Sequence, residues 1–339
     1  MARINYVITT WSGERRLRVM DWALPNDDPK QVPDLKRPRF HMPNHPEGYI
    51  DAQLKYLSWC EPKHIAQITV VNNVNPNAPQ HYIDFLANLP KDINGIPVVV
   101  LNRPNNGYSF GGFSHAYGTY RTAFTHYWFT EDDYWPVQKN FDEIALKMID
   151  NKDSFNADNG RNPVGWLCMM ASPWTCRPVD HASITQEITK DHAAGPHGLA
   201  KMEACEKTWQ RKGCLSHKDR EIPLDPRTGQ PLTYGELCID GQVFFSWDFV
   251  DSGYEVEDWR DYYAHYFAHE NGQIGWAPSR KTENTEPLIM CANGIHGGFP
   301  WGGLSGVPTR FKKPEWPVLV EPYSTKPGIL CPPNDVTVD

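Results

Sequence analysis

The sequence has no excess of basic side chains. Its 339 residues contain 33 Lys and Arg against 41 Asp and Glu, which gives a formal net charge of −8. Proteins that bind the phosphate backbone of nucleic acids need a cationic surface, so this balance argues against nucleic acid as a partner, although a local basic patch is compatible with it.

Long hydrophobic runs are also missing. No apolar stretch approaches the ~20 residues that a membrane-spanning helix needs. The first residues, MARINYVITTWSGERR, carry charge almost at once and lack the long apolar stretch of a secretory signal. These features predict a cytoplasmic protein without a membrane span.

Paired cysteine motifs are absent as well. The eight cysteines are scattered without CxxC spacing: Cys60, Cys168, Cys176, Cys205, Cys214, Cys238, Cys291 and Cys331. This pattern favours reduced thiols over a disulfide framework and does not suggest a zinc site. The abundant residues are instead 30 Pro, 15 Tyr and 13 Trp, and so much proline predicts many ordered loops around a core, above all at residues 21–47 and 216–235.

Short apolar runs alternate with helical patterns in the first half. Strands are predicted at 4–10, 67–73, 97–101 and 126–130, and helices at 49–60, 80–89 and 112–124. In the second half a strand is predicted at 165–171 and a helix at 199–210. Near-continuous apolar strands separated by helices are typical of an α/β domain with a mostly parallel sheet.

Three consecutive carboxylates, Glu131, Asp132 and Asp133, end the predicted strand at 126–130. Ligands of open α/β sheets bind at the carboxyl ends of strands, and three clustered carboxylates repel one another unless a cation neutralises them. Oxygen ligands suit Mg²⁺ or Mn²⁺. The alternative is a solvated acidic turn that begins the next helix.

A glycine-rich segment, NNGYSFGGFSH, follows the strand at 97–101. Gly107, Gly111 and Gly112 would let the backbone approach a ligand closely, and the next helix would present its positive end to an anion. The spacing fits neither the dinucleotide-binding fingerprint nor a Walker loop. An ordinary strand-to-helix turn is the alternative.

Four segments in this order resemble the nucleotide-sugar half of a GT-A-type glycosyltransferase of the family-2-like group: TTWSGERR, ITVVNN, PVVVLNRPNNGYSFGGFSHA and YWFTEDDYWP. That group commonly has a VVDNxS-like pattern after the second strand, NxG after the third and a DxD-type acid cluster after the fourth. The resemblance covers residues 3–136 well and continues loosely into the second half.

The resemblance implies a GT-A-like (Rossmann-like) α/β fold, with a mostly parallel central sheet flanked by helices and long proline-rich loops. A catalytic domain would span 1–305, with a nucleotide-sugar half at 1–136 and an acceptor half at 137–305. A proline-rich extension would follow at 306–339.

By position, the resemblance places seven residues around the nucleotide: Thr9, Thr10, Arg15, Asn72, Asn106, Gly107 and Asp132. Asn72 stands where the family usually has an aspartate that hydrogen-bonds the base. An amide both donates and accepts whereas a carboxylate only accepts, so the identity of the base stays open.

The same resemblance assigns a metal site and a catalytic base. Glu131, Asp133 and His296 would hold Mn²⁺ or Mg²⁺, and Asp240 would deprotonate the acceptor hydroxyl. His296 has the alternative of being a packed or surface histidine, and Asp240 that of capping a helix that it opens. Four nearby acids are rivals for the base: Asp248, Asp251, Glu255 and Asp258.

The implied activity is metal-dependent transfer of a hexosyl or pentosyl group, with inversion, from a UDP- or GDP-linked donor to a hydroxyl of a carbohydrate or glycoconjugate. A nucleotidyltransferase of related fold, a non-catalytic carbohydrate-binding protein and a metal-dependent hydrolase of phosphate esters are the alternatives. A nucleotidyltransferase usually has a glycine-rich loop with basic residues right after the first strand, and WSGERR is only a faint version of such a loop.

Overall fold

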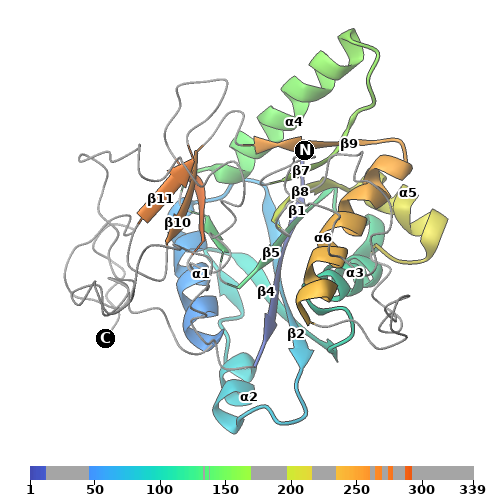
Figure 1. Ribbon diagram of the computed structural model, residues 1–339. Helices are drawn as coiled ribbons and strands as arrows, with labels where there is room; N and C mark the ends of the chain where they lie inside the picture. Colours follow the sequence, from blue (N-terminus) through green and yellow to red (C-terminus); the bar gives the residue numbers. More distant parts are fainter. Residues whose placement is uncertain are drawn as a thin grey trace, which may run out of the picture. The chain divides into compact units, whose positions relative to one another are not determined.

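The computed structural model describes nine stretches of the chain (Figure 1): residues 1–12, 46–132, 134–136, 138–168, 197–215, 234–259, 264–268, 274–277 and 287–291. Three predicted site residues, Arg15, Asp133 and His296, lie outside them, as does the predicted extension at 306–339. The chain forms two compact units, which we describe separately. The predicted boundary at residue 305 stays a prediction.

The first unit is built on an eight-stranded sheet with the order β3-β4-β2-β1-β5-β8-β7-β9. Its strands are β1 (Ile4–Trp11), β2 (Ile65–Val74), β3 (Asp92–Ile93), β4 (Ile96–Pro104), β5 (His126–Glu131), β7 (Val164–Cys168), β8 (Gly198–Lys201) and β9 (Glu255–Asp258). β4, β2, β1 and β5 are mutually parallel, and β9 is parallel to β7. Only β3 and β8 run against their neighbours, so the predicted mostly parallel sheet is confirmed.

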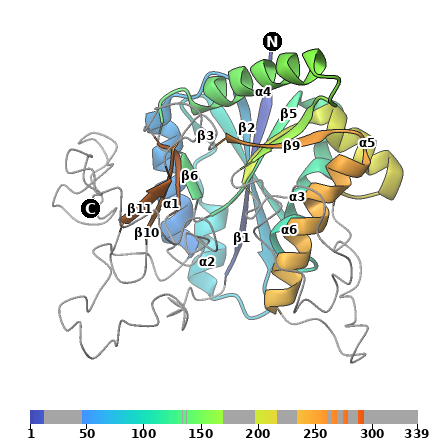
Figure 2. The ribbon, with the colours of Figure 1, turned by 45° about the horizontal axis from the view of Figure 1, so that its top comes forward.

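Helices α3 (Tyr108–Tyr120), α5 (Met202–Lys212) and α6 (Tyr234–Asp251) cover one face of this sheet, as Figures 1 and 2 show. Phe245 of α6 is central to the core beneath them. Its ring centroid lies 5.3 Å from that of Phe110, 5.8 Å from Phe129 and 4.8 Å from Trp166. This aromatic layer fixes α3 and α6 against the middle of the sheet.

On the opposite face, Trp128 stacks between Tyr6 and Trp259, with centroid distances of 6.0 and 5.9 Å. Helix α4 (Phe141–Asp158) crosses the end of the sheet where β1 and β5 begin (Figure 2). It is tied there by a hydrogen bond from the Val164 N–H to Asp153 and by a buried ion pair with β9. Helix α2 (Gln80–Ala87) follows β2 at the other end.

The four strands predicted in the first half are all present, together with the helix predicted at 80–89. The helix predicted at 112–124 instead begins at Tyr108, because Gly111 and Gly112 are part of it. The predicted helix at 199–210 is divided between β8 and α5, since its first residues pair with β5 and β7.

The second unit contains α1 (Pro46–Cys60) and a four-stranded sheet with the order β11-β10-β12-β6. Its strands are β6 (Tyr134–Pro136), β10 (Ala264–Ala268), β11 (Ile274–Ala277) and β12 (Pro287–Cys291). Trp135 packs against Tyr56 of α1 at 5.3 Å, and Gln53 Nε2 donates to the Tyr134 carbonyl at 2.7 Å.

None of the helices in the described stretches combines the length and apolar character that crossing a bilayer requires.

Candidate functional site

The strand order places a candidate ligand site at the carboxyl ends of four parallel strands. From β1 the chain builds outward through β2 and β4, and then returns to add β5 on the other side of β1. Ligands of such sheets bind outside the carboxyl ends of the strands, where the order reverses. Figure 1 shows the ends of β1 and β2 near α2.

Residue alternation divides the predicted site residues between the two faces of the sheet. Thr10 is in register with Asn72, and Asn72 with Asn102, so these three side chains share one face. Thr9 is in register with Glu131, and both lie on the face that α3 covers. Neighbouring residues of a strand point to opposite faces, so Thr9 and Thr10 have different surroundings.

On the face opposite α3, a hydrogen-bond chain fixes the orientation of Asn72. The Tyr82 hydroxyl of α2 donates to Asn72 Oδ1 at 3.1 Å, and Asn72 Nδ2 donates to Asn102 Oδ1 at 2.9 Å. The Tyr82 hydroxyl also lies 3.4 Å from Thr10 Oγ1. Asn72 is 9% exposed whereas Asn102 is exposed, so Asn102 is the amide of the pair that presents donors to solvent. The base contact of Asn72 stays a prediction.

On the α3 face, Thr9 is buried and its hydroxyl is already used. Thr9 Oγ1 donates to the Thr130 carbonyl at 3.3 Å, and its side chain is 2% exposed. A Cβ on Gly112 would lie 2.5 Å from Thr9 Cγ2, and one on Gly111 would lie 2.2 Å from the Asn106 carbonyl oxygen. Gly111 and Gly112 therefore serve close packing of α3 on the sheet, and the expectation that they approach a ligand is corrected.

The loop before α3 has a strained backbone. Gly107 has φ 83° and Tyr108 has φ 52°. Both angles lie in the left-handed region, which residues other than glycine rarely adopt. Gly107 is the N-cap, and its carbonyl accepts the Gly111 N–H at 2.9 Å. Asn106 is exposed, and the Oδ1 atom of Asn105 is buried without a partner among the described residues. Such strain often marks a binding site.

Arg103 lies beneath this loop and was not among the predicted site residues. It is 6% exposed, and its guanidinium donates to Asn73 Oδ1 at 2.7 Å and to the Asn106 carbonyl at 2.6 Å. The sequence shows only an arginine just after an apolar strand, and this pattern does not indicate that the arginine side chain is buried.

Glu131 ends β5 and accepts a hydrogen bond from the Ser109 hydroxyl in the first turn of α3. Its second carboxylate oxygen remains for a ligand, and such an oxygen suits Mg²⁺ or Mn²⁺. Asp132 is fully buried. Across the described stretches no group of three His, Cys, Asp or Glu side chains is placed to hold a metal ion. The metal site therefore depends on Asp133 and His296 and stays a prediction.

His197 begins β8 beside the same strand end. It is fully buried, and its Nδ1 lies 3.3 Å from Thr130 Oγ1. His197 was not among the predicted site residues. The strand pairing explains its position, because Gly198 pairs with Phe129 and the preceding residue falls opposite Thr130.

Asp240 lies inside α6, which begins at Tyr234. The expectation that Asp240 opens the helix is therefore wrong: α6 extends almost two turns further toward its N-terminus. The next residue, Gly241, packs against Phe110 of α3, since a Cβ there would lie 2.6 Å from the Phe110 ring. The role of Asp240 as a base stays a prediction.

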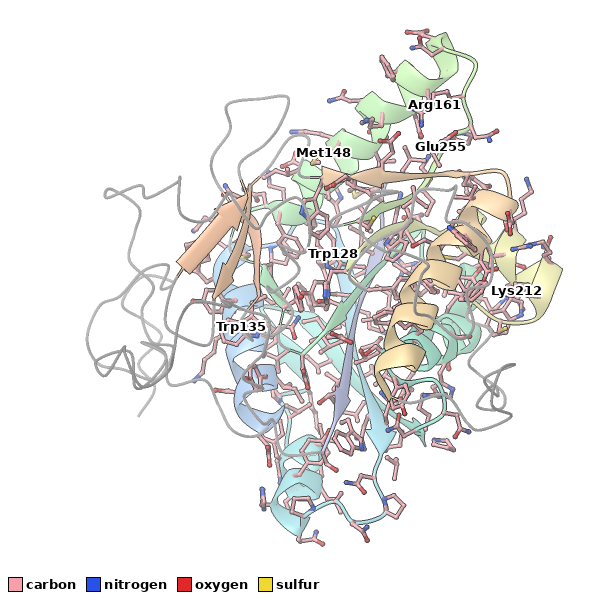
Figure 3. The ribbon with its side chains drawn as sticks, in the orientation of Figure 1. Trp128, Trp135, Met148, Arg161, Lys212 and Glu255 are labelled. Carbon is pink, nitrogen blue, oxygen red and sulfur yellow. The ribbon has the colours of Figure 1, made fainter. Side chains whose placement is uncertain are left out.

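Three rivals for the base are engaged with cations. Asp248 is buried and accepts from Lys212 and, at 3.1 Å, from Arg211. Arg211 also lies 3.9 Å from Asp251, and Arg161 pairs with Glu255 at 2.9 Å (Figure 3). Ion pairing stabilises the carboxylates and suits a structural role. The fourth rival, Asp258, is 6% exposed.

No protein-family model matches the chain, and no curated protein matches it in sequence. Among solved structures it is similar to a cytidylyltransferase from Leptospira borgpetersenii serovar Hardjo-bovis (15% identity, TM-score 0.31, 62% of this chain and 65% of that one). It is also similar to CMP:2-keto-3-deoxy-manno-octonic acid synthetase complexed with CTP (10% identity, TM-score 0.36, 76% of this chain and 89% of that one). A third similar structure is that of a mycobacterial protein (11% identity, TM-score 0.31, 61% of this chain and 55% of that one).

Proposed function

We propose that this protein is a transferase that binds a nucleotide-activated sugar at the carboxyl ends of β1, β2, β4 and β5. The observation that carries the proposal is the convergence of polar side chains and a strained glycine loop at the point where the strand order reverses. That position is where α/β sheets of this kind bind nucleotides.

The hydrogen-bond chain supports a nucleoside at this edge. Asn102 is held by Asn72 with its Nδ2 group free to donate, and such a donor complements a carbonyl oxygen of a nucleobase. Trp11 ends β1 with 40% of its surface exposed, which is unusual for so large an apolar side chain. An exposed indole at the end of β1 suits stacking against a base or sugar ring.

Glycosyl transfer is the first candidate reaction. Mn²⁺ or Mg²⁺ held by Glu131, Asp133 and His296 would neutralise charge on the diphosphate, and a UDP- or GDP-linked sugar would be the donor. The acceptor oxygen would bond to the anomeric carbon as the bond to the diphosphate breaks. Its proton would pass to Asp240, and the nucleoside diphosphate would leave.

Nucleotidyl transfer is the second candidate, and the residues that follow Ser12 favour it. Gly13, Arg15 and Arg16 form a short glycine-containing basic segment directly after β1. Basic side chains there would bind a triphosphate, a sugar oxygen would attack the α-phosphorus, and pyrophosphate would leave.

Thermal unfolding with UDP, GDP, CTP and their sugar conjugates, with and without Mn²⁺, tests the proposal. A ligand that binds the folded state raises Tm with its concentration, so a true substrate should raise Tm well above the other nucleotides. The released product then separates the candidates: a nucleoside diphosphate indicates glycosyl transfer, and pyrophosphate indicates nucleotidyl transfer. If none of these compounds raises Tm, the proposed function is wrong.

A further inference from the structure

We propose that Arg103 is a positioning residue, which holds the Asn105–Gly107 loop in its binding conformation without touching the nucleotide. This inference rests on the proposed function, because it concerns the same strand ends. Arg103 is buried, whereas Asn106 of the loop is exposed.

Arg103 connects three strand ends to the loop. Its NH1 group donates to Asn73 Oδ1 on β2 at 2.7 Å, and Asn73 Nδ2 in turn donates to the Thr10 carbonyl on β1 at 3.3 Å. Its NH2 group donates to the Asn106 carbonyl at 2.6 Å. The planar guanidinium can satisfy both acceptors at once in a fixed geometry, which a lysine ammonium cannot reproduce.

The start of α3 is shaped around this guanidinium. A Cβ on Gly111 would lie 2.8 Å from Arg103 NH2 and 2.9 Å from NH1. Alanine is far better than glycine in a helix interior, so a glycine there has a steric reason. The missing side chain gives the guanidinium room between the helix and the Asn106 carbonyl.

The loop needs such a restraint because its backbone is strained. Tyr108, with φ 52°, follows Gly107, with φ 83°. A side-chain-bearing residue in this region persists only where its surroundings hold it. The hydrogen bond to the Asn106 carbonyl acts two residues before Tyr108, so it restrains the segment at which the strain arises.

Holding the loop fixes which backbone groups face the ligand. Asn106 and Gly107 lie directly before α3, whose first N–H groups lack intrahelical partners. If Arg103 releases the Asn106 carbonyl, the loop relaxes and these groups no longer converge. Nucleotide affinity then falls, while catalysis by nucleotide-saturated protein is retained.

The test compares Arg103→Met and Arg103→Lys with the wild type. Amide hydrogen exchange of the ligand-free proteins should be faster at residues 105–111 in Arg103→Met and unchanged in α4. The Kd for the best of UDP, GDP and CTP should rise about 10- to 100-fold in Arg103→Met, the range expected when a residue that orients a binding group is lost. The Kd and the exchange rates of Arg103→Lys should lie between those of the wild type and Arg103→Met, because lysine keeps the positive charge and can still donate to one of the two acceptors.

Two readouts separate positioning from general destabilisation. In Arg103→Ala, millimolar methylguanidinium should restore part of the nucleotide affinity, and KM should rise with kcat retained. Arg161→Met is the control for loss of an arginine, because Arg161 is an exposed arginine that pairs with Glu255 and Glu257 away from these strand ends. It should leave nucleotide affinity unchanged.

The outcomes are distinct. Unchanged exchange at 105–111 in Arg103→Met and Arg103→Lys overturns the restraint. Faster exchange with unaltered nucleotide affinity overturns the positioning role. If the wild type binds none of the three nucleotides, the proposed function fails and the positioning role with it, although the exchange measurement still decides the restraint. If Arg103→Met does not fold, Arg103→Lys decides each point.

Discussion

The hydroxyl of Ser109 donates a hydrogen bond to Oε1 of Glu131, and so joins the first turn of α3 to the last residue of β5. The carboxylate lies at the positive end of the helix, where negative charge is stabilising. The same residue is a predicted metal ligand. The contact with Ser109 therefore orients the carboxylate of this predicted ligand.

Replacing Ser109 with alanine should lower the free energy of unfolding by about 1–2 kcal/mol, because a carboxylate loses its hydrogen bond. Mn²⁺ affinity should also fall if Glu131 is a ligand. Urea unfolding measures the first effect and manganese titration the second. Ser154→Ala is the control, since Ser154 is exposed on α4 and donates only to the Asp150 carbonyl. Equal stability of the two variants would contradict a role for the Glu131 contact.

Gly112→Ala should destabilise the protein by about 1–3 kcal/mol despite the better helix propensity of alanine, since overpacking outweighs it. The added Cβ would lie 2.5 Å from Thr9 Cγ2. Gly95→Ala separates this clash from backbone strain, because Gly95 has φ 81° and nothing within 4 Å of an added Cβ. Thermal unfolding measures the stability of both variants. Adding Thr9→Ser, which removes the clashing methyl group, should partly restore the stability of Gly112→Ala and should not restore that of Gly95→Ala.

Burial, and secondarily the nearby Lys201, lowers the pKa of His126 to about 4 from 6.5. The unfolded chain therefore binds a proton between these values that the folded protein does not, and stability should fall as the pH is lowered from 6.5 toward 4. This one group contributes a slope of at most about 1.4 kcal/mol per pH unit. The difference in unfolding free energy between wild type and His126→Gln should shift over that window and be constant above pH 7.5. A constant difference at all pH values would refute the shift.

The buried ion pair of Lys152 and Glu257, 2.7 Å apart, joins α4 to β9. Lys152→Met should cost about 3–5 kcal/mol because it leaves a buried carboxylate with weaker compensation, whereas replacing both partners with apolar residues should recover much of the loss. The exposed pair of Lys139 and Glu61 is the comparison, and Lys139→Met should change stability by less than about 1 kcal/mol. Chemical unfolding measures all three variants, and similar losses for the two single lysine variants would be inconsistent with this ordering.

If the reaction is glycosyl transfer, Asp240→Asn should retain nucleotide binding and lose turnover, because only the proton acceptor is removed. Asp133→Ala should lose metal-dependent nucleotide binding and turnover together. Calorimetric titration and product release measure these properties. Near-normal turnover of Asp240→Asn would assign the base elsewhere.

The strands of the parallel core were predictable because each is a near-continuous apolar run. The beginning of α3 was not, since Gly111 and Gly112 disfavour a helix locally, and only their contacts with Arg103 and Thr9 explain their presence. For a similar reason residues 199–201 of β8 were taken as part of a helix: they become a strand through pairing on both sides.

The candidate site was predictable where residues end strands and less so where contacts cross between elements. The family resemblance placed Thr10 and Asn72, and both lie near the ends of predicted strands. Tyr82 and Ser109 lie on helices, and their hydroxyls reach the site because α2 and α3 pack beside those ends. Local sequence carries no signal for such contacts.

The reversed direction of β8 has a consequence for the rim of the sheet. Since β8 runs against both of its neighbours, the polypeptide enters it at the rim where β5 and β7 finish. His197, the residue before Gly198, therefore lies at that rim. A substitution of His197 changes the rim while leaving the pairing of β8 with β5 and β7 intact.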